Sequence, residues 1–149
     1  MDIQVDGLKE LIRKLEHLGG DCEKALSDGL KQGALHIQAA AKEKAPYDTG
    51  RLRGSISIEE EKPLQIGIGT NVEYAPHVEL GTGTQGDPSV SHTTRESWVY
   101  MGSDGKFYTS HGQPPQPFLA PALEQEKENV AKEVKLALLE AIKERMDKK

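Results

Sequence analysis

The chain has 149 residues, which is typical of one domain and enough to bury a hydrophobic core without disulfides. Its net charge of −5 disfavours tight binding along the phosphate backbone of nucleic acid, and no apolar run approaches the ~20 residues of a membrane-spanning helix. A single cysteine, Cys22, excludes an intramolecular disulfide and a cysteine-rich zinc site, and it fits a reducing cytosol.

Two helices are predicted in the first third of the chain. Residues 6–18 place leucine and isoleucine at helical spacing, and Gly19-Gly20 then ends the pattern. Asp21 is a suitable N-cap for a second helix, which should end before Pro46 because the residue preceding a proline avoids helical geometry. The expected core positions of this second helix are Leu26, Leu30, Ala34, Ile37 and Ala41.

Beyond residue 50 the apolar period changes from helical to two. Residues 55–61 and 64–70 alternate isoleucine or leucine with other residues, and Lys62-Pro63 between them predicts a hairpin turn. Residues 72–84 are expected to form a turn followed by a third short strand, after which Gly81 and Thr82 turn the chain sharply.

Residues 84–112 form an insertion rich in glycine, proline and serine that nevertheless holds most of the aromatic residues. Within it, residues 96–111 predict a small hairpin around Asp104-Gly105. A long excursion from a compact domain is usually functional or disordered, and the aromatic residues of this one predict an ordering contact.

A long C-terminal helix is predicted to follow the insertion. Its apolar stripe consists of Leu119, Leu123, Val130, Val134, Leu138, Ile142 and Met146. The predicted fold class is therefore α+β: long N-terminal and C-terminal helices packed on a small antiparallel β-sheet, in a single domain of residues 1–149 with a long loop or hairpin insertion.

Asp48-Thr49-Gly50 spells the tripeptide of aspartic proteases, and a short chain with one copy could form a homodimeric site. Such a site needs two carboxylates that share a proton, and Arg51 next to the tripeptide would instead keep Asp48 ionised. The favoured interpretation is a helix-to-strand turn, with Asp48 bonded to nearby backbone N–H groups and Gly50 at positive φ.

No other stretch predicts chemistry, so no catalytic, cofactor or metal site is assigned. The histidines lack the spacing of a helical metal site, and a metal between His92 and His111 of the insertion is a minor alternative. The glycine-rich stretches at 67–71 and 79–87 lack the Gly-Lys-Ser/Thr of a phosphate loop. Cys22, near a helix start, is most simply a packing residue.

Three ordered motifs resemble a known family. The first motif contains Pro46, Asp48, Thr49, Gly50, Arg51, Leu52, Arg53 and Ile56. The second contains Tyr74, Ala75, Val78, Glu79, Gly81 and Thr82. The third contains Pro115, Pro117, Phe118, Leu119, Pro121 and Ala122. In this order they resemble the phage tail-component family founded by the tenth gene product of a lambda-like coliphage, from which the insertion at 84–112 departs by its length.

The resemblance implies a non-enzymatic virion structural protein of the head–tail connector, without a cofactor. It implies a homo-oligomeric ring between the portal-side connector and the tail, through which DNA passes without specific binding. The protein would be assembled in the bacterial host cytoplasm, would not associate with membranes, and would use its motif residues for subunit contacts or structure. Two alternatives remain: a homodimeric aspartic protease using Asp48, and an adaptor that binds a partner through residues 84–112.

Overall fold

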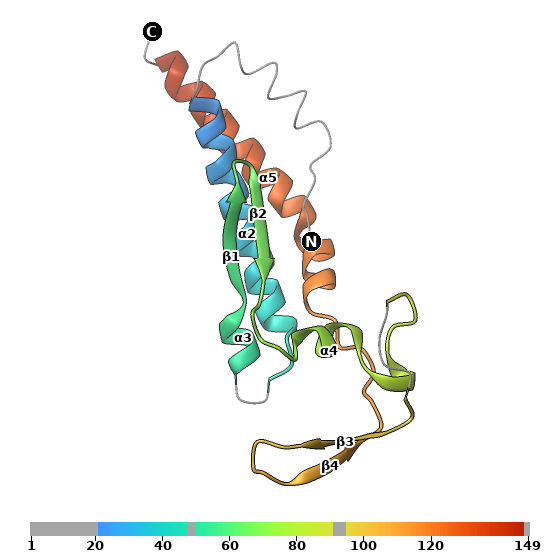
Figure 1. Cartoon of the computed structure of the whole chain (residues 1–149). Helices are drawn as coiled ribbons and strands as arrows, with labels where there is room; N and C mark the ends of the chain where they lie inside the picture. The colour runs from blue at the N-terminus through green and yellow to red at the C-terminus, as the bar shows by residue number, and fades with distance from the viewer. Residues whose placement is uncertain (1–20, 48–49, 91–94, 148–149) are drawn as a thin grey trace.

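Two long helices form the body of the molecule (Figure 1). The computed structural model describes residues 21–47, 50–90 and 95–147. Helix α2 spans Asp21–Lys44 and helix α5 spans Leu119–Asp147, and they lie side by side. Both were predicted from their apolar spacing and are confirmed, whereas the helix predicted at 6–18 and the cap predicted from Asp21 depend on residues outside the described ranges.

Two glycines bring these helices unusually close together. A Cβ atom on Gly29 would lie 2.8 Å from Cα of Val134, and one on Gly33 would lie 2.9 Å from Cα of Val130. Rising positions on α2 therefore meet falling positions on α5, so the helices are antiparallel. Because real Cβ atoms do not approach backbone this closely, residues 29 and 33 must be glycine for this packing to form.

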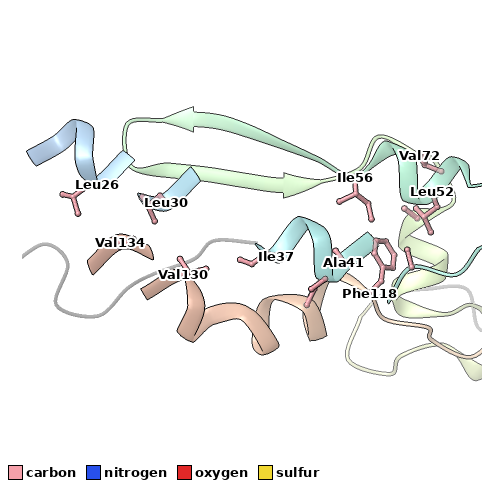
Figure 2. Packing of buried hydrophobic residues seen from close by; sticks show 14 of the residues in the cluster. Leu26, Leu30, Ile37, Ala41, Leu52, Ile56, Val72, Phe118, Val130 and Val134 are labelled. Carbon is pink, nitrogen blue, oxygen red and sulfur yellow. The ribbon is translucent and has the colours of Figure 1, made fainter. Parts of the chain in front are cut away.

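The core lies along this helix pair and continues past the end where α2 finishes and α5 begins (Figure 2). All five positions predicted for α2 are buried. On α5, Val130, Val134 and Leu138 are buried, and the other stripe residues except one are packed against the core. The exception is Met146, which belongs to the predicted stripe but is 71% exposed, because the last turn of α5 extends past the described part of α2.

The predicted central hairpin is confirmed. Strand β1 spans Ser57–Lys62 and β2 spans Gln65–Gly69; they pair antiparallel, with Ile58 opposite Ile68. Ile66 and Ile68 pack against the core, and a salt bridge of 3.0 Å joins Glu60 to Lys31 of α2. The hairpin thus lies on α2 (Figure 1).

Before this hairpin, the structure contains a helix that the sequence pattern did not reveal. Gly50 has a φ of 80°, as predicted, but Arg51–Ser55 then form the short helix α3 and not a simple turn into a strand. Ile56, expected within the strand, precedes β1 and is buried. One turn of helix places Leu52 and Ile56 on the same side, where both reach the core.

The third strand predicted in 72–84 is wrong, because this segment forms helix α4, Ala75–Leu80, followed by the 3₁₀ helix η1, Gly83–Gln85. Gly81 and Thr82 therefore follow a helix and not a strand. A proline in the first turn is compatible with a helix, and the spacing of three between Ala75 and Val78 lets both pack on the core.

The insertion contains the hairpin predicted around Asp104-Gly105. Strand β3 spans Trp98–Met101 and β4 spans Phe107–Ser110, paired antiparallel. This hairpin projects from the helical body (Figure 1). The predicted α+β class is confirmed, with the long helices packed together and two separate two-stranded antiparallel sheets. Across the described ranges, no helix combines the length and hydropathy of a membrane span.

The glycine contact predicts a matched pair of stability changes. Gly33→Ala places a methyl group against the backbone of α5, whereas Gly54→Ala on α3 meets nothing within 4 Å. Both changes gain the same helix propensity, so the free energy of unfolding should be lower for Gly33→Ala by about 1–3 kcal/mol because of overpacking. Urea denaturation of both variants measures the difference, and equal stabilities would refute the close contact.

Candidate functional site

The N-terminus of α5 is capped by a carboxylate from another helix. Glu79, in the last turn of α4, accepts backbone N–H groups from Phe118 at 2.7 Å, Leu119 at 3.0 Å and Ala120 at 2.9 Å. The next residue, Pro121, has no N–H to satisfy. One side chain thus pairs the exposed donors of the helix start and places negative charge where the helix dipole favours it.

The C-terminus of α2 is capped in the complementary way. The Arg53 Nε–H donates to the carbonyl of Ala45 at 2.9 Å, and the Arg53 guanidinium lies 5.1 Å from the centre of the Tyr47 ring. Its neighbour Arg51 lies 6.0 Å from the centre of the Tyr74 ring. A cation at the end of a helix is favourable, so Arg53 does for α2 what Glu79 does for α5.

Backbone hydrogen bonds tie the second motif to the segment that enters α5. The backbone groups of Thr82 and Gln113 bond to each other in both directions, at 2.9 and 3.2 Å, and the Gln116 N–H donates to the Val78 carbonyl at 2.8 Å. Gly81 sits inside this contact at a φ of 71°, and a Cβ there would lie 2.7 Å from the Gln113 carbonyl oxygen. The close crossing and the backbone angle both require glycine at this position.

The third motif is anchored by an aromatic residue. Phe118 is completely buried, and Figure 2 shows its ring in the same cluster as Ala41, Leu52 and Val72. Residues of all three motifs therefore meet around the junction of α2, α3, α4 and α5. We call this region the capping junction and define it by Arg53, Glu79, Gly81, Gln113 and Phe118.

The predicted site residues differ in how they are placed around this junction. Those that are buried are Leu52, Ala75, Gly81, Thr82 and Phe118. Those that are half-buried are Pro46, Gly50, Arg53, Val78, Glu79, Leu119 and Pro121. Those that are exposed are Arg51, Tyr74 and Pro117. Asp48 and Thr49 lie outside the described residues, and the role of the whole set in subunit contacts stays a prediction.

The sequence patterns did not reveal Gln113 of the capping junction or Tyr47 beside it. Gln113 bonds through its backbone to Thr82 and through its side-chain amide to the His77 carbonyl at 2.9 Å, yet it lies in the irregular insertion. The Tyr47 ring contacts the Arg53 guanidinium, yet it lies in the loop that follows Pro46. Neither residue has a periodic signal, because the partners of Gln113 are distant in sequence and Tyr47 lies in a loop.

On one face of the insertion hairpin, two aromatic residues contact each other. The rings of Tyr100 and Tyr108 lie 6.0 Å apart, and the Tyr108 hydroxyl donates to the Asp104 carboxylate at 2.5 Å. This hydrogen bond lowers the pKa of the Asp104 carboxyl and raises the pKa of the Tyr108 phenol. The predicted turn is therefore held by an ionised aspartate and a neutral tyrosine at neutral pH.

The opposite face of the same hairpin is apolar and open. Val99 is 65% exposed, Met101 64% and Phe107 74%. The antiparallel register and the alternation of strand side chains put these three on one face. Of the two faces of this hairpin, only the one with Tyr100 and Tyr108 makes an ordering contact of the predicted kind. The open face of Val99, Met101 and Phe107 is the candidate surface for the adaptor alternative.

The cysteine and the histidines do not form a functional site among the described residues. Cys22 is buried in the core cluster, as expected of a packing residue. Among the described residues, no three metal-binding side chains gather in one place. His92 lies outside those residues, so the alternative of a metal between His92 and His111 stays a prediction.

The cap on α5 predicts a specific loss of stability. Glu79→Ala leaves three backbone N–H groups without their acceptor and should lower the free energy of unfolding by about 1–3 kcal/mol. Glu79→Gln keeps one acceptor oxygen and should lose less. The control is Glu128→Ala on the exposed side of α5, which should change stability by about 0.5 kcal/mol or less. Thermal or urea unfolding measures all three, and equal values for Glu79→Ala and Glu128→Ala would contradict the cap.

Comparison with known proteins agrees with the motifs. Residues 9–81 match the family model described as "Bacteriophage HK97-gp10, putative tail-component". No curated protein and no solved structure matches the chain. The matched range includes the first motif and the second motif as far as Gly81, inside the capping junction. Thr82 and the segment from η1 through α5 lie beyond it. Residues 9–81 of the chain therefore match the HK97-gp10-like family, whose model is described as a putative phage tail component.

Proposed function

We propose that this protein is a non-enzymatic structural component of the virion of a phage or prophage, acting at the connector between head and tail. The observation that carries the proposal is the family match over residues 9–81. The protein is assembled into a homo-oligomeric ring in the bacterial cytoplasm. The ring joins the portal-side connector to the tail, and DNA passes through its centre without specific binding.

The construction of the capping junction supports a structural role. Both carboxylate oxygens of Glu79 accept backbone N–H groups, and Arg53 is bonded to a helix end, so these charged motif residues hold the ends of helices in place. A joining protein has to transmit force between neighbours without unfolding. Capped helix ends and a buried aromatic anchor make the junction rigid, which suits that task.

The flanks of Asp48 support this proposal over the protease alternative. The aspartic-protease tripeptide follows an apolar strand that holds the carboxylate at a dimer axis. Here the tripeptide lies between the end of α2 at Lys44 and the start of α3 at Arg51, so helices flank it on both sides. A helix-to-helix connection does not supply the rigid paired strands on which the shared proton of that site depends.

Gene deletion tests the proposed function. Removing the gene from the phage or prophage that carries it should abolish infectivity, because DNA-filled heads and tails accumulate without being joined. Electron microscopy of the lysate and plaque counts measure this, and the wild-type chain supplied in trans should restore joined particles. Normal infectious particles from the deletion would overturn the proposal.

The same complementation separates the joining role from the protease. Asp48→Asn supplied in trans should restore infectivity as well as the wild-type chain does. Restoration by the wild type but not by Asp48→Asn, together with peptide cleavage by the wild type, would favour the protease.

A second candidate function is favoured by the open face of the insertion hairpin. Val99, Met101 and Phe107 expose an uncharged surface at the end of a projecting element, as a contact with another protein would use (Figure 1). We therefore propose that this face contacts the neighbouring connector or tail protein. This role adds to ring formation and does not replace it.

Met101→Ser/Phe107→Ser tests this contact. Both side chains are mostly exposed, so the double variant should keep its stability, yet it should be incorporated poorly into particles. Western blots of purified particles measure incorporation. Leu35→Ser, which changes an exposed apolar residue on α2, is the matched control and should be incorporated normally. Normal incorporation of the hairpin variant would exclude this face as the contact.

A further inference from the structure

Two outward-facing surfaces lie on opposite sides of α2. Gly29 and Gly33 of α2 face α5. On the other side of α2, Lys31 pairs with Glu60 of β1, and Gln38 donates to the carbonyl of Ile56 just before β1. The order across the molecule is therefore hairpin β1–β2, then α2, then α5 (Figure 1). The outer face of the hairpin and the outer face of α5 point away from each other.

The outer face of the hairpin is a shallow, acidic trough. Its volume is about 580 Å³, and its floor is the backbone of Gly67 and Gly69, which stand opposite Glu59 and Ser57 of β1. Nothing lies within 4 Å of where a Cβ on Gly69 would be, whereas the Glu61 side chain lies over Gly67, with a carboxylate oxygen 2.6 Å from where a Cβ would be. We call this surface the glycine trough and define it by Ser57, Glu59, Glu61, Gly67 and Gly69.

The three consecutive glutamates of β1 lie on two different faces of the hairpin. Glu60 points to the inner face and pairs with Lys31 at 3.0 Å. Its neighbours Glu59 and Glu61 point outward because strand side chains alternate. Glu61 is held over the trough by the Gln65 amide at 2.9 Å, and across the described ranges neither outward carboxylate has a cation within 4.0 Å. The trough is thus complementary to a basic surface.

The outer face of α5 has the required chemistry. Helical spacing puts Lys132, Lys135, Leu136, Leu139 and Lys143 on the side away from Val130, Val134 and Leu138 of the core. Leu136 is 55% exposed and Leu139 52%. In the described part of the chain, no salt bridge engages the three lysines. We call this surface the lysine ridge and define it by Lys132, Lys135, Leu136, Leu139 and Lys143.

We propose that the lysine ridge of one copy docks into the glycine trough of the next copy. The lysines meet Glu59 and Glu61, and the leucines lie over the open backbone at Gly69, where the missing side chain lets a helix approach. The two surfaces are different and lie on opposite sides of one chain, so the contact is heterologous. Repeated contacts of this type close into a ring when the rotation between copies allows it. The inference rests on the proposed function and supplies the contact for its ring.

Cysteine trapping tests the pairing in assembled particles. Ser57→Cys in the trough and Leu139→Cys in the ridge are combined in a Cys22→Ser chain and treated with a short bis-maleimide linker. The double variant should give a ladder of covalent multimers longer than a dimer. Each single variant should give none, because a heterologous contact needs both surfaces. Dimers from one single variant would show an isologous contact and overturn the inference.

Other occupants of either surface give different products and also overturn the inference. Linkage of Leu139→Cys to another virion protein, or no linkage at all, would mean that the ridge contacts a different protein or residues 1–20 of its own chain. Failure of the proposed function is distinguishable. If the double-cysteine variant gives a ladder but deletion of the gene leaves infectivity intact, the contact between copies is retained and the joining role is rejected. If the deletion leaves heads and tails unjoined but the double-cysteine variant gives no ladder, the joining role is retained and the contact is rejected.

Charge reversal provides an independent measurement on the purified full-length chain. Glu59→Lys/Glu61→Lys and Lys132→Glu/Lys135→Glu should each weaken self-association by about tenfold or more in light scattering, and all four changes in one chain should restore it. Glu43→Lys/Glu73→Lys makes the same charge change at two exposed sites elsewhere and should have little effect. Equal weakening by the control, or no restoration in the combined variant, would contradict the pairing.

Discussion

The close antiparallel contact between α2 and α5 is the constraint on which the rest of the structure depends. Gly29 and Gly33 let the backbones approach so closely that a side chain at either position would collide with α5. This contact fixes the order of the layers, because it commits one side of α2 to α5 and leaves the other for the β1–β2 hairpin. It also brings the end of α2 next to the start of α5, where the three motifs gather.

Opposite charges stabilise the two helix ends that this packing places together. The end of α2 carries exposed carbonyls, and Arg53 donates to one of them; the start of α5 carries exposed N–H groups, and Glu79 accepts three. Each charge has the sign that its helix end favours. The three motifs therefore have a physical explanation here: two of their charged residues, Arg53 and Glu79, are capping residues, and Gly81 and Phe118 provide the close turn and the aromatic anchor.

The outer surfaces follow from the same layers. Because α2 is enclosed between the hairpin and α5, the molecule presents an acidic, glycine-floored face on one side and a lysine- and leucine-bearing helix face on the other. The insertion hairpin adds a third, uncharged surface that projects from the body. Different surfaces in different directions suit a protein that contacts copies of itself and other proteins at the same time.

The sequence by itself determined the elements with a strong local signal. The apolar stripes of α2 and α5, the alternation of β1–β2, the positive φ of Gly50 and the hairpin around Asp104 all follow from contacts between near neighbours. Only the tertiary structure decided that 75–80 is a helix, because burial of Ala75 and Val78 on one side outweighs a pattern that also fits a strand. Likewise, the roles of Glu79, Arg53, Gln113 and the two glycines of α2 depend on partners distant in sequence or in irregular loops, and no periodicity records such contacts.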